Sequence, residues 1–177
     1  MNEKIAIVVV TTVLMFSNVY ADLSDGAYGA IQLASVDDGS GDNSVLTFVG
    51  RLGKNINKNF SFEGRLGFST DETKTYPYPN WDKSLGIDKL FGVYGVGHLN
   101  VGDSVSAYGL VGYTRVDATV AVYGSGTKSV DDYDLSFGLG IDIAIGRDWS
   151  LNAEYIQYLS SSEFDINATA IGVMYYF

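Results

Sequence analysis

Large apolar side chains occupy every second position over long stretches of this chain, and this alternation constrains the fold more than any other feature. In "FSFEGRLGFS", residues 60–69, phenylalanine and leucine alternate with Ser, Glu and Arg. Residues 134–145 repeat the pattern with Leu, Phe and Ile. Because successive strand residues point to opposite faces, a period of two predicts strands with one apolar face. The 21 glycines, 13 tyrosines and two prolines also favour β structure.

The pattern predicts an all-β fold of eight antiparallel, up-and-down strands. They are expected at 26–36, 44–53, 60–70, 88–99, 105–116, 131–145, 149–159 and 164–177. The connections at 53–59, 100–104 and 146–148 are short. Those at 37–43, 70–87, 117–130 and 160–163 are mostly longer and more polar. Tight turns at one end and long loops at the other are typical of a transmembrane β-barrel.

The first residues are expected to be a secretory signal peptide rather than part of the fold. The apolar run 5–16 is too short to cross a bilayer, which takes about 20 residues. Val19-Tyr20-Ala21 then supplies a small-residue cleavage pattern. We therefore expect a signal peptide at 1–21 and a barrel domain at 22–177. The chain has no cysteine, so strand pairing and packing must hold the exported fold, and its net charge of −10 argues against nucleic-acid binding.

The apolar face could point inward, as in a soluble lipocalin-like barrel, or outward, toward lipid. The interior of an eight-stranded barrel is barely wide enough for its own side chains. It could not hold every Phe, Leu and Ile of the apolar face, so we expect those residues outside and the charges inside. The strand ending at Phe177 then closes the barrel, because an unpaired backbone group in lipid has no water to bond.

Seven charged residues are expected to form an ion-paired network that plugs the interior: Arg51, Glu63, Arg65, Asp142, Glu154, Arg115 and Asp134. Centring the second hairpin on Asn57 puts Arg51 opposite Glu63. Strands three and seven face each other across the barrel, so Arg65 can reach Glu154. Buried ions must be paired to be tolerated.

Other interior and rim positions follow from the same reading. Asp142 is expected near Glu154, and Arg115 is expected to pair with Asp134 near the outer end of strand five. Small inward residues leave room for long side chains, namely Gly138, Gly140, Ala168, Ala170 and Gly172. Aromatic residues near strand ends are expected in the interfacial girdles, namely Tyr28, Tyr108, Trp149, Tyr155 and Tyr175.

The segments "NFSFEGRLGF", "WSLNAEYIQY" and the terminal "IGVMYYF" resemble the small outer-membrane β-barrels of Gram-negative bacteria, the OmpA-transmembrane-like or OmpX-like group. The resemblance covers the whole mature chain. It implies a location in the outer membrane and insertion by the barrel assembly machinery, aided by periplasmic chaperones. That machinery reads an aromatic C-terminal strand, here Tyr175 and Phe177. Members of the group are envelope-stabilising proteins, adhesins or proteins of unknown role.

An enzymatic role is not expected. Some similar barrels modify lipid A with a His–Ser–carboxylate set, but His98 is the only histidine and no His-x-Ser pattern surrounds it. It should lie beside the short turn at Asn100. The acidic segments 37–43 and 131–134 lack the spacing of a metal-binding loop, so no metal or cofactor is expected. The stretch "TYPYPNW", 75–81, would suit contact with a partner.

Three functions therefore remain open. The first is a non-enzymatic outer-membrane barrel with a structural or surface-interaction role. The second is a narrow, porin-like channel for small solutes, and the third is a lipid A-modifying enzyme. The expected partners are outer-membrane lipids and lipopolysaccharide, with a host or surface ligand at the outer loops, and the expected state is a monomer.

Overall fold

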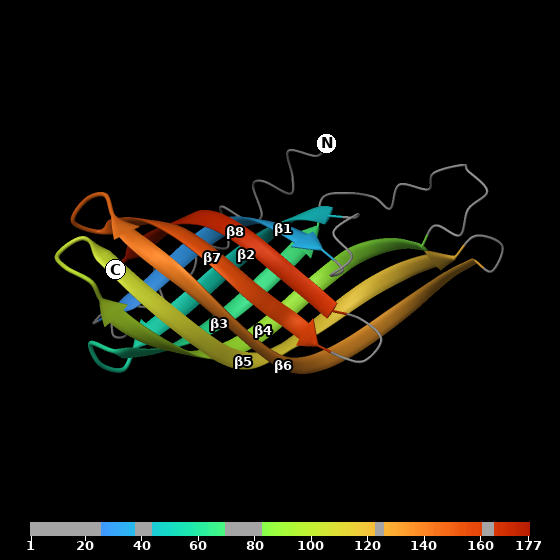
Figure 1. The fold of residues 1–177 in the computed structure, drawn as a ribbon, viewed down its shortest axis with the longest axis horizontal. Helices are drawn as coiled ribbons and strands as arrows, with labels where there is room; N and C mark the ends of the chain where they lie inside the picture. The colour runs from blue at the N-terminus through green and yellow to red at the C-terminus, as the bar shows by residue number, and fades with distance from the viewer. Residues whose placement is uncertain (1–25, 38–43, 70–82, 123–125, 161–164) are drawn as a thin grey trace.

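A computed structural model describes residues 26–37, 44–69, 83–122, 126–160 and 165–177. It contains eight strands: β1 (Ala27–Asp37), β2 (Ser44–Asn55), β3 (Phe60–Ser69), β4 (Lys83–Asn100), β5 (Val105–Val122), β6 (Gly126–Ala144), β7 (Trp149–Ser160) and β8 (Asp165–Tyr176). Each strand pairs antiparallel with the next, and β8 pairs with β1, so the sheet is a closed barrel (Figure 1). The predicted eight-stranded up-and-down barrel is confirmed. No helix able to span a membrane occurs among the described residues.

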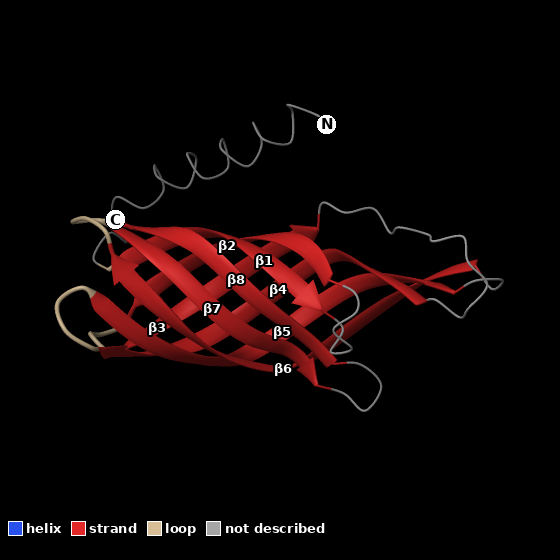
Figure 2. Ribbon diagram, turned by 45° about the horizontal axis from the view of Figure 1, so that its top comes forward, coloured by secondary structure: helices blue, strands red, loops and turns tan. Residues whose placement is uncertain are grey.

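The two ends of the barrel differ. The turns 56–59, 101–104 and 145–148 lie at one end, together with Phe177, and we call this the turn end (Figure 2). At the opposite loop end, β4, β5 and β6 run on beyond the other strands (Figure 1). These three strands have 18, 18 and 19 residues, whereas the others have 10 to 12.

Two predicted loops were too long. Most of 117–130 continues β5 and β6, and β4 begins at Lys83 inside the predicted loop 70–87. The β-branched residues of 116–122, among them Val116, Thr119 and Val120, favour continued strand pairing over a loop. The continuous β5–β6 register, which reaches Val122↔Gly126, shows that this pairing forms.

The predicted inside-out arrangement is confirmed by the exposure of the side chains. On the outer face, Phe62 is 66% exposed, Leu66 63% and Leu139 71%. On the inner face, Arg51 and Arg65 are 2% and 1% exposed. A surface of large apolar residues around a charged interior is what a barrel in a bilayer requires.

The last strand closes the barrel as predicted. Its residues pair along the full length of β1, for example Leu33 with Ile171. The Phe177 amide donates to the Ala27 carbonyl at 2.9 Å. The rings of Tyr175 and Trp149 lie 4.9 Å apart, and those of Tyr175 and Phe177 lie 5.2 Å apart. The alternating apolar end of the chain is thus both the seam of the barrel and an aromatic cluster at the turn end.

The predicted β2–β3 register was wrong by two residues. Arg51 pairs with Arg65 and Gly53 pairs with Glu63, so the hairpin is centred on Lys58 rather than Asn57. The Asn57 side chain accepts hydrogen bonds from the Asn59 and Phe60 amides, which fixes this turn. A shift of two keeps every side chain on its predicted face.

The β6–β7 hairpin shows a related difference. Asp142 lies opposite Asn152, and Glu154 lies opposite Gly140. The predicted like-charge neighbours are therefore separated along the strand, and an amide side chain stands directly across from Asp142.

Two tyrosines predicted for the interfacial girdle lie inside the barrel instead, because Tyr28 and Tyr108 are only 2% and 3% exposed. Each ring lies over a glycine of a neighbouring strand. A Cβ atom would come within 2.2 Å of the Tyr28 ring at Gly53 and within 2.3 Å of the Tyr108 ring at Gly140. These glycines leave the space that the inward rings fill. Trp149 and Tyr155, 50% and 53% exposed, do lie on the outer face as predicted.

Gly112→Ala should destabilise the barrel, because its Cβ would stand 2.1 Å from the Val93 carbonyl oxygen, a backbone atom that no rotamer change can move. Overpacking of this kind costs roughly 1–3 kcal/mol of unfolding free energy. Gly64→Ala is the matched control, since nothing lies within 4 Å of its Cβ position. Urea unfolding in detergent should separate the two variants, and equal stabilities would contradict the packing described here.

Candidate functional site

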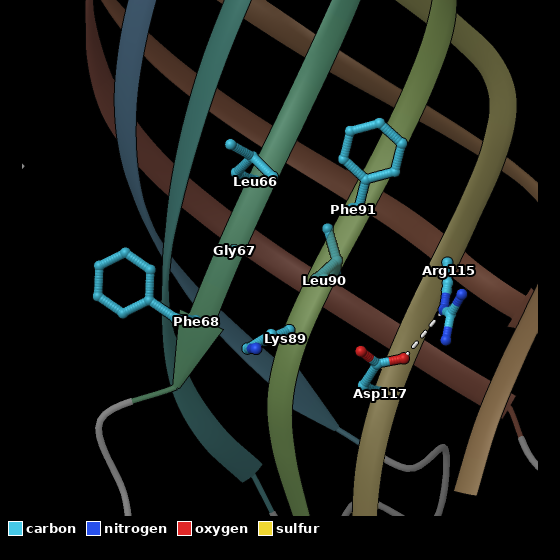
Figure 3. Close-up of a pocket in the computed structure, with 8 residues that line it drawn as sticks. All are labelled: Leu66, Gly67, Phe68, Lys89, Leu90, Phe91, Arg115 and Asp117. Atoms are coloured by element: carbon cyan, nitrogen blue, oxygen red, sulfur yellow. Dashed lines mark hydrogen bonds and ion pairs between the residues drawn. The ribbon is translucent and has the colours of Figure 1, made fainter. Parts of the chain in front are cut away.

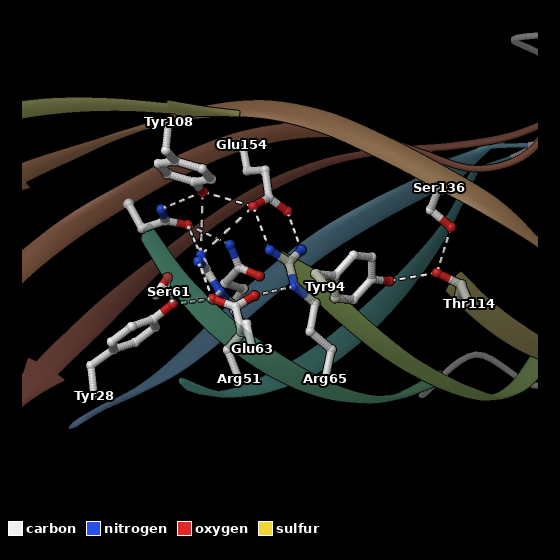
Figure 4. Close-up of polar contacts among 12 residues, drawn as sticks. Tyr28, Arg51, Ser61, Glu63, Arg65, Tyr94, Tyr108, Thr114, Ser136 and Glu154 are labelled. Atoms are coloured by element: carbon white, nitrogen blue, oxygen red, sulfur yellow. Dashed lines mark hydrogen bonds and ion pairs between the residues drawn. The ribbon is translucent and has the colours of Figure 1, made fainter. Parts of the chain in front are cut away.

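The centre of the barrel holds four charged side chains from three strands. Arg51 of β2 donates to Glu63 of β3 through Nε at 3.0 Å and Nη2 at 2.7 Å. Arg65 of β3 donates to Glu63 through Nε and to both oxygens of Glu154 on β7, one of them at 2.8 Å (Figure 4). A weaker pair joins Arg51 to Glu154 at 3.7 Å. The two arginines and two glutamates thus form a continuous ring of alternating charge.

Neutral side chains supply further hydrogen bonds to these four charged groups. The Tyr28 hydroxyl donates to Glu63 at 2.9 Å, and the Tyr108 hydroxyl donates to Glu154 at 2.7 Å. The Arg51 Nη1 donates to the Asn152 amide oxygen at 3.0 Å. Each glutamate therefore accepts from two kinds of donor, and such charge-assisted hydrogen bonds are the strong ones.

A second polar layer lies next to the ions on the loop-end side. The Arg65 guanidinium lies 4.7 Å from the centre of the Tyr94 ring. The Tyr94 hydroxyl bonds Thr114, whose hydroxyl bonds Ser136 at 2.6 Å (Figure 4). Ser136 also donates to the Tyr158 carbonyl at 2.7 Å. Side chains of β3, β4, β5 and β6 and a backbone carbonyl of β7 are thus linked in this layer.

The burial and charge balance of the network explain why it is tolerated. The side chains of Arg51, Glu63, Arg65 and Glu154 are at most 1% exposed. Two positive and two negative charges cancel, and each ion has several partners. Ions buried without partners would be strongly destabilising. The arrangement leaves the centre of the barrel filled by paired charges.

Five of the seven predicted network residues meet in the interior. Arg51, Glu63, Arg65 and Glu154 contact one another, and Asp142 joins them through Asn152, which donates to it at 2.6 Å. Arg51 reaches Glu63 although the two are not cross-strand partners, because the long side chain spans the two-residue offset.

The structure does not bring Arg115 and Asp134 together, so that part of the prediction was wrong. Arg115 lies on the outer face and pairs with Asp117 on its own strand at 3.0 Å. Asp134 lies in the inward-facing series of β6, next to the cross-strand partner of Arg115, which is Tyr133. Side chains on opposite faces of a sheet cannot form an interior pair.

Sequence analysis missed several interior residues that hold the ions, namely Tyr28, Ser61, Tyr94, Tyr108 and Asn152. The alternation of inward and outward positions along each strand already indicated that these residues face the interior. Tyr28 shares its face with Ala30 and Gln32, and Asn152 shares its face with Glu154. Nearness to strand ends points Tyr28 and Tyr108 to the interfacial girdle, whereas the alternation alone places them inside.

His98 lies near the turn end, as expected, but it has a partner that the sequence did not reveal. Its Nε2 lies 2.9 Å from the Ser61 Oγ, and that hydroxyl is also bonded to Tyr28 at 3.1 Å. The serine comes from β3, so no local His-x-Ser pattern could have shown it. Ser61 is 2% exposed, which keeps its oxygen inside the barrel wall.

Other predicted features lie outside the described part of the chain. These are the signal peptide 1–21, nearly all of the acidic segment 37–43, and the stretch 75–81. Among the described residues, no three His, Cys, Asp or Glu side chains gather in a metal-binding group.

Comparison with known proteins gave a family match over nearly the whole chain. The model of the outer membrane protein β-barrel domain matches residues 6–177. No curated protein sequence matches. Among solved structures, the attachment invasion locus protein Ail of Yersinia pestis is similar, with a TM-score of 0.58 and 16% identity over 85% of this chain and 96% of that one.

Two further structures have the same fold. Neisserial surface protein A has a TM-score of 0.60 and 16% identity over 85% of this chain and 96% of its own. The N-terminal β-barrel domain of Pseudomonas aeruginosa OprF has a TM-score of 0.62 and 12% identity over 85% and 97%. At these identities the likeness concerns the fold.

Arg65→Ala should lower the free energy of unfolding by about 3–5 kcal/mol, because it leaves Glu63 and Glu154 short of a buried partner. Denaturant unfolding in detergent measures this loss. Arg147→Ala, at an exposed turn position, is the control and should change stability by under about 0.5 kcal/mol.

Replacing both partners, as Arg65→Met with Glu154→Leu, should cost less than Arg65→Ala alone. The double variant removes the Glu154 charge together with Arg65, and Glu63 stays paired with Arg51. An Arg65→Ala barrel as stable as the wild type would contradict the network.

Proposed function

This chain belongs to the outer membrane protein β-barrel family, and from that premise we propose that it is a closed, non-conducting barrel that presents a binding edge outside the cell. Its place as an integral protein of the outer membrane follows from the family and from its apolar outer face. In such barrels the short turns face the periplasm and the longer segments face outward. The turn end is therefore the periplasmic end, and β4, β5 and β6 project from the cell.

The observation that carries the surface role is the three-stranded projection, which we define as residues 83–89 of β4, 117–122 of β5 and 126–136 of β6. Within the described residues, β3 pairs with β4 only as far as Leu90, and β7 pairs with β6 only as far as Phe137. Beyond those points the three strands pair only among themselves. Among the residues with described positions, no strand therefore pairs with the outer edges of the projection, and an open edge is a template for another strand.

The direction of the edge amides can be derived for β6. Near the turn end, the Ala144 amide donates to Ser104, which precedes β5, and the Ile145 amide donates to Trp149 of β7. The β5–β6 register has no shift, so even-numbered amides of β6 point toward β5 along its whole length. Odd-numbered amides, such as that of Ser129, point away from β5 at the open edge. An extended peptide segment could accept hydrogen bonds from them.

One similar protein supports a role in contact with other molecules. Ail is named an attachment invasion locus protein and has been crystallised with a heparin analogue, sucrose octasulfate. For this chain, the net charge of −10 favours recognition through backbone pairing over recognition of a polyanion.

The remaining functions fit less well. A channel requires an open lumen, but paired charges from β2, β3 and β7 meet at its centre. A lipid-modifying enzyme requires an accessible nucleophile, but Ser61 beside His98 is buried and lies at the periplasmic end. We propose a structural role for that pair, and no cofactor.

The biogenesis of the protein follows from the family and remains part of the proposal. Residues 1–21 act as a signal peptide and 22–177 form the barrel. Periplasmic chaperones and the barrel assembly machinery insert it, and Tyr175 and Phe177 supply the recognition signal from the outer face of the closing strand. The barrel lies as a monomer among lipopolysaccharide and other outer-membrane lipids.

Peptide-array binding to the folded barrel tests the surface role. Extended peptides should bind the wild type, and Ser129→Pro should weaken that binding at least tenfold because it removes an edge amide. Ser129→Ala keeps the amide and should bind normally. Peptides that bind Ser129→Pro as tightly would contradict edge pairing, and an array with no bound peptide would contradict the surface role.

Planar-bilayer recording tests the closed interior. The purified barrel, whose mass should correspond to a chain beginning at Asp22, should show no steady conductance. Regular openings at neutral pH would favour the channel and contradict the plug.

A further inference from the structure

A hollow on the outer surface of the barrel combines an apolar wall with two cations. It has a volume of about 330 Å³ and lies between the loop-end parts of β3, β4 and β5. We call it the loop-end groove. Its side chains are Leu66 and Phe68 of β3, Lys89 and Phe91 of β4, and Arg115 and Asp117 of β5 (Figure 3).

The inner part of the groove belongs to the lipid-facing surface. Leu66 and Phe91 are cross-strand partners and are 63% and 53% exposed. Phe68 follows Leu66 on the outer face of β3 and is 37% exposed. On β3 the outward apolar residues run from Phe60 to Phe68. With a rise of about 3.4 Å per residue and a tilt of about 40°, they cover roughly 20 Å of height. This nearly fills the apolar band of about 25 Å in such barrels, so Phe68 lies close to its outer edge.

The cations stand just above that edge. Lys89 lies opposite Asp117, and Arg115 lies opposite Phe91. The Arg115 Nε donates to Asp117 at 3.0 Å, and these two side chains are 58% and 41% exposed. The ion pair holds the guanidinium beside the groove, and Lys89 adds a second positive charge. The three charges sum to +1, in a chain whose total is −10.

We propose that the loop-end groove binds a phosphorylated lipid of the outer leaflet, with its phosphate at Lys89 and Arg115 and an acyl chain along Leu66 and Phe91. Three observations favour a lipid. The cations face outward at the level of lipid headgroups, the groove continues from them into the apolar band, and a guanidinium with an ammonium matches the charge and geometry of a phosphate. The phosphorylated glycolipid of the outer leaflet, lipopolysaccharide, has both required parts.

This inference rests on the outward orientation of the loop end proposed above, and it does not depend on peptide binding at the β6 edge. It also differs from general attraction of anionic lipid to basic residues. A specific site requires the cations at this groove, whereas general attraction would be served equally by Lys54, an exposed cation near the turn end.

Native mass spectrometry of the full barrel in detergent tests the site, with bisphosphorylated lipid A and its dephosphorylated form as probes. Lys89→Gln with Arg115→Gln should weaken binding of the phosphorylated probe at least tenfold and leave the dephosphorylated probe unchanged. Lys54→Gln, the matched control, should stay within twofold of the wild type. Phe91→Ala should weaken both probes, because it removes an acyl contact.

Three results would overturn the proposal. These are equal binding of the two probes by the wild type, unchanged binding by the double variant, and an equal loss in Lys54→Gln. Gel mobility of boiled and unboiled samples establishes that each variant is folded. If the wild-type barrel binds peptides but not the phosphorylated lipid, this site is wrong and the surface role stands. If it binds the lipid but no peptide, the surface role is wrong and this site stands.

Discussion

Closure of the backbone hydrogen-bond ladder is the constraint on which the rest of this structure depends. In hydrocarbon an unpaired amide or carbonyl has no water to bond, so a sheet can persist there only if its first and last strands meet. The pairing of β1 with β8, from Tyr28↔Tyr176 to Asp37↔Asn167, meets that requirement. It also explains why the chain ends on an apolar strand, because Ile171, Val173 and Phe177 face lipid at the seam.

Closure with eight strands then determines the interior. The lumen is only wide enough for side chains, and alternation sends every second residue into it. Charges that enter such a space need partners within reach, and the chain supplies them from β2, β3 and β7. The tyrosines fit only because facing positions such as Gly53 and Gly140 lack side chains. Filling and charge pairing are therefore two consequences of the same narrow lumen.

The sequence was sufficient to predict the fold and to predict whether nearly every strand residue faces the lipid or the interior. Both follow from the alternation of apolar and polar residues with a period of two. It was less informative about register. The β2–β3 offset depends on how Asn57 bonds the Asn59 and Phe60 amides, a detail that alternation does not contain. Strand ends at the loop end were also underestimated. The change from apolar to polar at Arg115 and Asp117 on the outer face of β5 marks the edge of the membrane, whereas the strand itself continues to Val122. The contact of Ser61 with His98 depends on neighbouring strands and could not be found locally.

The unequal strand lengths have a consequence for access to the cell surface. Residues 117–122 of β5 continue the barrel wall in unbroken register with β6, so the hairpin that the two strands form extends the sheet beyond the rim. At about 3.3 Å per residue it rises roughly 15–20 Å above the rim. Of the residues that the structure describes, a bulky object approaching the cell would meet the outer part of this hairpin first.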